Sequence, residues 1–592
     1  MSAEHYWSAL ERTRISRRRV IGGALAAGGG LALAGCGSTG SKKSPVAGTS
    51  SSAGPASVGS PTAQAEGIPD SGLPWPYNFP EPNKTAKPGG VMKVAATWDT
   101  SILDPTKTSA GGTITMLNIA YNRLIAIRSG IHQVNPFKLN LDGEIAEKWE
   151  QPQPNQYIFH LAPNIKYQDV APLNGRDFTA ADVKYAYERY AKEGVQTPFF
   201  KDVDSITAAD DHTLSITLKQ PSADFLVPLA SRYLTLFPRE LVESGQIEKM
   251  AVGTGPMILK DVVQSDHVTM VKFPKYWKKD VLLDGLEFRI MPDASSRLAA
   301  FRAGQVDYGY SVVDNRRDLE ALLASNPKVQ VNLASAVNST FSISPNLQNP
   351  KFQDERVRQA LMLAMDRDTL TNVIYGKGLA KTLPTMPWDF VFDKEPTGDQ
   401  LGPWWHYDPA EAKKLLAAAG AEGLSFDMIY YEYSVAGNTR SNEVLTDQLK
   451  QAGITIRPQK VDYTTFNSQW VGGTYKEAAD GWYTLGFDAN TYFYNQIYSK
   501  SPGNRWHIND PQLDEWALKQ YGELDAQARR QIQKQMWDRI LQKAYRIEKP
   551  VAIGFETYQP SLRGIRFTGQ PHGANSSYYE WGVQVADAWL DK

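Results

Sequence analysis

The sequence predicts a mixed α/β fold with more than one domain, and three observations lead to this class. Strand-like stretches rich in β-branched and aromatic residues alternate with apolar-periodic stretches that carry helix caps. Hydrophobic residues make up 42% of the chain, which is a normal share for a globular protein. About 500 residues follow a low-complexity N-terminal part, and a chain of that length usually builds two or more cores. The class is therefore α/β or α+β.

The first predicted strand lies in residues 89–98 (GGVMKVAATW), where apolar and β-branched residues follow a pair of glycines. The same composition predicts further strands at Tyr157–Leu161, Thr213–Leu218, Val268–Phe273 and Ile454–Arg457.

Three helices have clear start and stop signals. One begins at the capping sequence Thr179 to Asp182 and ends at Gly194. A second spans residues 408–420, with Asp408 before a proline at the first helical position and a glycine at the stop. A third is predicted over residues 354–375, where apolar residues recur at helical spacing.

Residues 1–35 have the layout of an export signal, with clustered arginines followed by an apolar and glycine-rich run. That run, at about 15 residues, is shorter than the roughly 20 that a membrane-spanning helix needs. Arg17 and Arg18 lie in a segment, SRRRVI, that resembles the twin-arginine export motif. The general secretion route is the alternative.

Cys36 is the only cysteine in the 592 residues, which excludes an internal disulfide and a CxxC-type zinc site. It ends the sequence LAGC, which resembles the bacterial lipobox, so Cys36 is the predicted lipidation site. The alternative is an ordinary cleaved signal with a chance cysteine. Residues 36–87 are rich in Gly, Ser, Ala, Thr and Pro, and this composition predicts a disordered tether.

Charge and motifs argue against several classes of function. The formal net charge is −1, which disfavours a surface for nucleic acid or anionic lipid. The sequence contains no HExxH, GxSxG or Walker motif. GTGP at residues 253–256 lacks a following lysine and is interpreted as a tight turn. We therefore predict no catalytic residues and no cofactor, although paired glycosidase carboxylates would leave no sequence trace.

No metal site is predicted either. Asp488 to Asn490 begins like a calcium loop, but Phe493 stands at the sixth position, where glycine is required. His406 and His507 could in principle hold a nickel chelate, yet solvated surface histidines are the simpler interpretation.

Several stretches, in order, resemble conserved segments of the bacterial family 5 (peptide-type, dipeptide/oligopeptide/nickel) extracellular solute-binding proteins of ABC transporters. They are NGRDFTAADVKYA (174–186), VGTGP (252–256), YW (276–277), LDGLEFR (283–289), AGQVD (303–307), FQDERVRQAL (352–361) and YDPAEAKKLL (407–416). The resemblance runs from about residue 89 to 550, most of the folded part. Any one match alone would be weak, whereas seven in family order are specific.

The resemblance implies a two-lobed periplasmic-binding-protein (Venus flytrap) fold, type II-like, with an extra inserted small domain. By analogy with the family, lobe I is residues 88–113, 202–290 and 553–592. The inserted small domain is 114–201, and lobe II is 291–552. Ligand would bind between the open lobes, and a two-segment hinge would close around it.

The resemblance also implies where ligand binds. Residues 480–492 (DGWYTLGFDANTY) resemble the family's strand and loop that line the ligand cleft. Leu485 stands where peptide binders of the family carry an aspartate for the peptide's α-amino group, and a leucine cannot neutralise a buried ammonium. With a register shifted by one residue, Asp488 could take that role. The aromatic residues predicted at the cleft are Trp98, Trp482, Tyr483 and Tyr492, and Asn338 is a further candidate.

These observations predict a lipid-anchored, extracytoplasmic solute-binding protein, monomeric, that delivers peptides or similar-sized oligomers to an ABC permease. The departure at Leu485 makes oligosaccharides the alternative ligand, since flat aromatic faces also suit sugar rings. A secreted lipoprotein glycosidase is a more distant alternative, and a sensor or adhesion lipoprotein that uses the same clamp is another.

Overall fold

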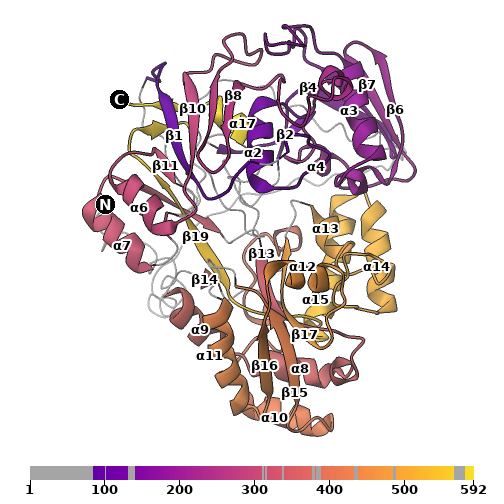
Figure 1. The fold of residues 1–592 in the computed structure, drawn as a ribbon. Coiled ribbons are helices and arrows are strands. Elements are labelled where there is room, and N and C mark those ends of the chain that lie inside the picture. Colours follow the sequence, from indigo (N-terminus) through magenta and orange to yellow (C-terminus); the bar gives the residue numbers. More distant parts are fainter. Residues whose placement is uncertain are drawn as a thin grey trace, which may run out of the picture.

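The structure is a computed structural model. It describes residues 85–100, 102–130, 140–309, 312–313, 316–335, 339–376, 380–381, 388–432, 438–484, 488–565 and 581–592. Within these residues the strands and helices form two bodies, one above the other in Figure 1. We call the described residues of 85–335, 380–381 and 551–592 lobe I, and the other described residues of 339–550 lobe II.

Lobe I is built on the largest sheet, which has eight strands among the described residues. Its strand order is β12-β19-β11-β1-β10-β9-β8, and β14 also pairs with β19. β1 runs parallel to both of its neighbours, β10 and β11. The strands are β1 (Val91–Ala96), β8 (Met257–Val263), β9 (His267–Lys272), β10 (Gly285–Ile290), β11 (Tyr308–Gly309), β12 (Gln330–Ser335), β14 (Ala380–Lys381) and β19 (Val551–Tyr558).

A smaller antiparallel sheet lies at the side of lobe I, with strand order β4-β5-β7-β6. Its strands are β4 (Ala146–Gln153), β5 (Gln156–Leu161), β6 (Val203–Asp210) and β7 (Thr213–Leu218). β5 and β7 alternate buried and half-buried residues, so one face of this sheet is packed and the other faces outward. Two short pairs complete the strands of this lobe: β2 (Ile125–Ile127) with β3 (Leu141–Gly143), and β20 (Leu562–Arg563) with β21 (Trp589–Leu590).

Lobe II is built on a mixed sheet with strand order β16-β15-β17-β13-β18. β15 runs parallel to β16 and β17, whereas β13 runs antiparallel to β17 and β18. The strands are β13 (Ser339–Pro345), β15 (Ser425–Tyr430), β16 (Thr455–Lys460), β17 (Ala478–Thr484) and β18 (Ile547–Glu548).

Helices cover these sheets. Those of lobe I are α2 (Gly111–Ala120), α3 (Ala180–Lys192), η2 (Thr197–Phe200), α4 (Leu226–Leu229), α5 (Arg239–Glu243), α6 (Ala294–Arg302), α7 (Arg316–Ser325) and α17 (Trp581–Val585). Those of lobe II are η3 (Pro350–Phe352), α8 (Glu355–Leu363), α9 (Arg367–Leu370), η4 (Thr371–Tyr375), η5 (Trp388–Phe390), η6 (Gly398–Leu401), α10 (Pro409–Ala418), α11 (Asn438–Gln451), α12 (Tyr463–Val471), α13 (Ala489–Phe493), α14 (Pro511–Gly522) and α15 (Ala526–Gln542).

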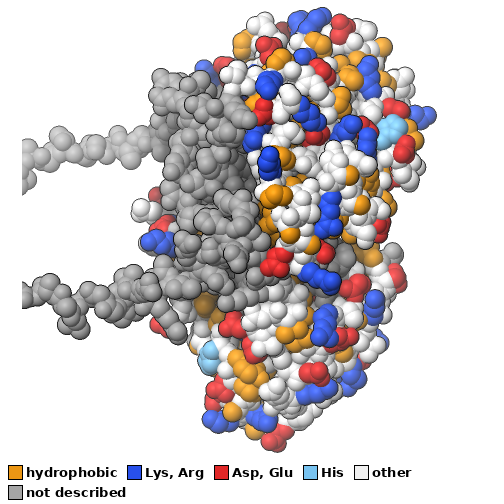
Figure 2. All heavy atoms as spheres, turned by 90° about the vertical axis from the view of Figure 1, so that its left-hand side faces the viewer, with side chains coloured by type: hydrophobic (Ala, Val, Ile, Leu, Met, Phe, Trp, Pro, Cys, Tyr) orange, Lys and Arg blue, Asp and Glu red, His pale blue; other side chains and the backbone are white. Residues whose placement is uncertain are grey.

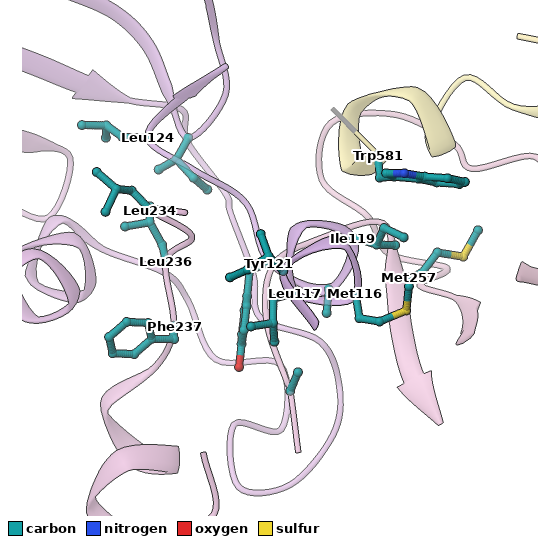
Figure 3. Close-up of a cluster of buried hydrophobic side chains, with 14 of the residues drawn as sticks. Met116, Leu117, Ile119, Tyr121, Leu124, Leu234, Leu236, Phe237, Met257 and Trp581 are labelled. Carbon is teal, nitrogen blue, oxygen red and sulfur yellow. The ribbon is translucent and has the colours of Figure 1, made fainter. Parts of the chain in front are cut away.

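Helix α2 joins the large and the small sheet of lobe I into one hydrophobic core. Every residue of α2 except Gly111 is buried, as expected for a helix that is packed on all sides. Figure 3 shows Met116 and Ile119 of α2 near Met257 and Trp581, with Leu124, Leu234, Leu236 and Phe237 on the other side of Leu117 and Tyr121. The small sheet is therefore part of lobe I and has no separate core.

The predicted strands are all present, with ends that differ by two residues or fewer for β5, β7 and β9. The helices predicted from capping signals at residues 179 and 408 are α3 and α10. The single helix predicted over 354–375 is wrong: it is interrupted after α8, and α9 and η4 follow. The reason is Asp366, whose carboxylate accepts hydrogen bonds from the backbone N and the hydroxyl of Thr369 and so starts a new helix.

The strand pairing divides the chain differently from the expected domain limits. β11 and β12 lie between residues 308 and 335 and pair with strands of lobe I, whereas lobe II was expected from 291 onward. β6 and β7 belong to the small sheet, although the inserted domain was expected to end at 201. Both differences arise because strand partners far apart in the chain decide which sheet a segment joins.

No helix in the described part of the chain combines the length and the apolar character needed to cross a bilayer. On the face shown in Figure 2, basic and acidic side chains are interspersed over the coloured surface. This mixture agrees with the near-zero formal charge of the sequence.

Candidate functional site between the two lobes

The two lobes are connected where the chain passes between the two larger sheets. In the described residues it leaves lobe I after β12 and enters lobe II at β13, and it finally returns from β18 to β19. Between these crossings the two-residue strand β14 pairs with the start of β19. β12 pairs with β19 and β13 pairs with β18, so the strands that flank the two connections are paired with each other. Two adjacent connecting segments between separate bodies form the usual hinge of a protein that opens and closes around a ligand.

A buried polar cluster holds the returning connection to lobe II. Lys549 lies between β18 and β19, and its Nζ is 2.8 Å from a carboxylate oxygen of Asp480 in β17. The Asn442 side chain accepts from Lys549 Nζ at 2.9 Å and donates to Asp480 at 3.1 Å. The side chains of Lys549 and Asp480 are 4% and 0% exposed. Such a charge pair is tolerated in a protein interior because each partner has hydrogen bonds within the cluster.

The lobes also touch on the opposite side of the molecule. Figure 1 shows α13 and α14 of lobe II below α3 and α4 of lobe I on the right, whereas β19 passes between the bodies on the left. The contact is an ion pair between Asp224, just before α4, and Arg529 of α15. Arg529 Nη1 and Nη2 donate to the two oxygens of Asp224 at 2.6 and 2.5 Å. Both side chains are mostly buried, at 12% and 13% exposed.

Further hydrogen bonds complete this ion pair on the lobe II side. The backbone N of Asn490 donates to Asp224 at 2.9 Å. The Asn490 side-chain oxygen accepts from Gln520 at 2.8 Å and from Arg529 at 3.2 Å. Arg529 Nε also donates to the backbone oxygen of Gln520 at 3.0 Å. We call Asp224, Asn490, Gln520 and Arg529 the interlobe network.

A second contact lies beside this network. The Tyr521 hydroxyl of α14 donates to Asp202 of lobe I, and the backbone N of Ala223 donates to the backbone O of Tyr521 at 3.2 Å. Lys201 Nζ of lobe I lies 4.7 Å from the ring centre of Tyr494 and 5.3 Å from that of Tyr521. Burial and the bond to Asp202 raise the pKa of Tyr521, so this hydroxyl keeps its proton at neutral pH.

Asp488 adjoins the interlobe network as the N-cap of α13. Its two carboxylate oxygens accept from the backbone N of Thr491 at 2.7 Å and from the Thr491 hydroxyl at 2.6 Å. Burial, and then the negative charge of Asp224, raise the pKa of Asp488 to about 6, against the opposing effects of Thr491 and Arg529. Both oxygens of Asp488 are therefore engaged in capping in this conformation.

The other predicted site residues lie in different surroundings. Trp98 follows β1, is half-buried, and packs its ring 5.9 Å from that of Phe288. Tyr492 is 1% exposed and belongs to the lobe II core, where Arg546 stacks on its ring at 4.8 Å. Tyr492 therefore differs from the expectation of a residue at the cleft surface.

The remaining predicted residues are only partly described or not described. The backbones of Trp482 and Tyr483 lie in β17, opposite Phe341 and Thr340 of β13. Leu485 and Asn338, and also Cys36, Arg17 and Arg18, lie outside the described residues.

The described residues contain no group of three His, Cys, Asp or Glu side chains placed to hold a metal ion. His406 is exposed, and the His507 ring N–H donates to the backbone O of Gly473 at 2.7 Å.

Sequence reasoning missed the interlobe network and the cluster around Lys549. Asp224 and Arg529 are 305 positions apart and carry no local motif, so the sequence offers no sign that they meet. Asp480 did carry a signal, because a lone carboxylate interrupts an otherwise apolar strand, and such a charge requires a partner when it is buried.

Comparison with known proteins agrees with this geometry. The model of the family "Bacterial extracellular solute-binding proteins, family 5 Middle" matches residues 140–504, more than half of the chain. Heme-binding protein A from Haemophilus influenzae is 26% identical over 497 residues, which cover 78% of this chain and 86% of that protein. The dipeptide-binding protein from Escherichia coli is 26% identical over 63% of this chain and 72% of its own length.

Among solved structures, the periplasmic binding protein DppA from Helicobacter pylori, in complex with the peptide STSA, has a similar fold. Its TM-score is 0.68 at 22% identity, and the match covers 86% of this chain and 99% of that one. The two sequence relatives are named for the binding of heme and of dipeptides. Together with the two-lobed fold, the family match establishes that the chain belongs to the bacterial extracellular solute-binding proteins of family 5.

Proposed function

We propose that the protein is the lipid-anchored solute-binding component of an ABC importer and captures peptides or peptide-sized oligomers between its lobes. Family membership is the observation that carries this proposal, since members are extracytoplasmic binding proteins that supply ABC permeases. The paired strands that flank the two connections, and the contacts on the opposite side, support it, because they are the parts that a closing clamp requires.

The ligand class is supported by the relatives. The E. coli relative is named for dipeptides and the H. pylori structure contains a tetrapeptide. The Haemophilus relative is named for heme, so the ligand class needs a direct measurement. Leu485 keeps oligosaccharides as the alternative, because it leaves the expected position of the amine-pairing aspartate without a charge.

Native mass spectrometry of the protein, purified from its own host without added ligand, tests the ligand class. A ladder of peptide masses is the expected result. Hexose-spaced masses would replace peptides by oligosaccharides, and a heme mass with a Soret absorption band would replace both. A protein that carries no cargo, and whose melting temperature is unchanged by peptide, oligosaccharide and heme panels, would contradict the proposal.

Lipidation at Cys36 is tested by fractionating cells of the native host. The wild-type protein is expected in the membrane fraction, whereas Cys36→Ala is expected in the soluble extracytoplasmic fraction, because the thiol is the only one that lipid could modify. Ser38→Ala is the matched control and should remain with the membrane. A Cys36→Ala variant that stays in the membrane fraction would contradict the anchor.

The export route is tested in the same cells. If the twin-arginine pathway is used, Arg17→Lys with Arg18→Lys leaves unprocessed protein in the cytoplasm, while Arg12→Lys is exported normally. Normal export of the double variant would assign the general secretion route instead.

A further inference from the structure

We propose that Asp224 and Arg529 form a latch that holds the two lobes closed on the side away from the hinge. The two residues belong to different lobes and join them through a bidentate ion pair. The proposal rests on the proposed function in one respect, namely that the lobes must open to admit ligand. The proposal assigns to the Asp224–Arg529 pair a role in setting the ratio of closed to open molecules.

The position of the pair gives it influence over opening. When one body rotates about a hinge, points far from the axis move farthest. β19, the first strand of lobe I after Lys549, lies on one side of the molecule, whereas α13 and α14 lie on the other side, where Arg529 of α15 contacts lobe I (Figure 1). Rotation about the connections would therefore separate Asp224 from Arg529 before it disturbed the paired strands near Lys549.

The geometry of the pair also favours closure after the loss of hydration is counted. A buried ion pair contributes little when its remaining hydrogen-bonding groups are left without partners. Here the carboxylate of Asp224 accepts from two guanidinium nitrogens and from the backbone N of Asn490. Arg529 in turn donates to Asn490 and Gln520 of its own lobe, which fix the guanidinium in place before the lobes meet. A prearranged guanidinium loses less side-chain entropy when the lobes close.

The neighbouring charged groups of α15 bind partners within lobe II. Within α15, Arg530 binds the backbone O of Val391 and the carboxylate of Asp393, both in lobe II. Lys534 and Asp538 pair with each other along the same helix. These groups keep their partners when the lobes separate, so they provide matched controls.

The experiment measures the distance between the lobes in the full-length protein. Cys36→Ala removes the only native thiol, and Val263→Cys in β8 with Asp447→Cys in α11 places one spin label on each lobe. Both positions are solvent-exposed. Pulsed electron paramagnetic resonance then gives the distribution of closed and open distances for each variant, without any added ligand.

Asp224→Asn keeps the shape of the side chain and removes its charge. We expect it to lower the ratio of closed to open molecules by roughly 10- to 100-fold, the range for the loss of a hydrogen bond between charged groups. Arg529→Gln should have a similar effect, and the double variant should open no further than either single one. Arg530→Gln and Asp538→Asn should give the wild-type distribution.

The latch is overturned if Asp224→Asn and Arg529→Gln leave the distance distribution unchanged, or if Arg530→Gln changes it as much as Arg529→Gln. It is also overturned if the wild-type lobes stand open. The proposed function is judged separately, from the cargo in native mass spectra of the wild-type protein. If the wild-type protein carries cargo but has no latch, the proposed function is supported and only the latch is refuted.

Discussion

Asp488, near the lobe contact, has a shifted pKa: burial and the charge of Asp224 raise it to about 6. The pKa of an aspartate in an unfolded chain is near 3.8. Between about pH 4 and 6 the folded protein therefore binds more protons at this residue than the unfolded chain does. The contribution of Asp488 to stability is greatest below the unfolded pKa and is lost as the pH rises through the folded pKa.

Asp488→Asn tests this pH dependence. Asparagine caps helices as well as aspartate does, so the variant removes the charge and keeps the cap. We expect its stability relative to the wild type to improve between pH 4 and pH 7, as measured by urea unfolding at both values. Relative stability that is independent of pH, or that worsens as the pH rises, would show that Asp488 is not protonated near pH 6 in the folded state.

Lys549 contributes to the stability of the protein through its buried partner, Asp480. Lys549→Met leaves the Asp480 carboxylate without its cation in a site that is 0% exposed. Removing one member of a buried pair costs about 3–5 kcal/mol of unfolding free energy, which urea unfolding can measure. Combining Lys549→Met with Asp480→Leu should restore part of this loss, because no charge then remains in the interior.

The control for this prediction is Lys534→Met. Lys534 and Asp538 form a pair whose side chains are 39% and 58% exposed, so the change should stay within about 0.5 kcal/mol. Equal losses for Lys534→Met and Lys549→Met would contradict the role given to burial.

At the scale of elements, the turn at residues 253–256 leads into β8 and is hydrogen-bonded to the chain at the end of α2. Gly255 N donates to the backbone O of Ala120 at 3.0 Å, and Thr254 donates to the Asn122 side chain at 2.9 Å. A Cβ on Gly255 would lie 2.3 Å from the backbone O of Ile119. The glycine is therefore required by the close approach of two backbones.

Gly255→Ala should destabilise the protein by about 1–3 kcal/mol or more, because backbone atoms and not a flexible side chain must move. Gly522→Ala, at the end of α14, is the matched control. Its Cβ would meet only Pro221 O at 3.7 Å, and alanine favours the helix. Chemical denaturation of both variants checks the prediction, and a neutral Gly255→Ala would refute the packing argument.

At the scale of the whole molecule, the two lobes have separate cores. The main lobe I core contains α2 and the lobe I sheet, whereas the lobe II cores are built on β13, β15, β17 and the helices around them. Lobes with separate cores unfold as separate units more easily than as one. Differential scanning calorimetry should therefore give a calorimetric enthalpy larger than the van't Hoff enthalpy.

The two destabilising variants test whether each thermal transition belongs to one lobe. Gly255→Ala lies in lobe I and should lower mainly one transition, whereas Lys549→Met weakens lobe II and should lower mainly the other. A single transition that moves as a whole in both variants would show that the interlobe contacts couple the cores into one cooperative unit.

The sequence by itself determined the local elements and the family. β1, β5, β7, β9 and the capped helices α3 and α10 follow from residues that are neighbours in the chain, because periodicity and caps act over a few positions. The break before Asp366 was missed, although its capping side chain is just as local, because the apolar spacing continues across it. The seven ordered motifs led to the family that the comparisons establish.

Only the tertiary structure decided which segments share a sheet and which charges meet. β11 and β12 join lobe I through partners more than 200 residues away. The sequence does not show that Asp224 meets Arg529 or that Asp480 meets Lys549, because an ion pair between distant residues depends on chain folding and not on spacing. Tyr492 became a core residue for the same reason: the sequence shows that a ring is present, and packing alone decides which way it faces.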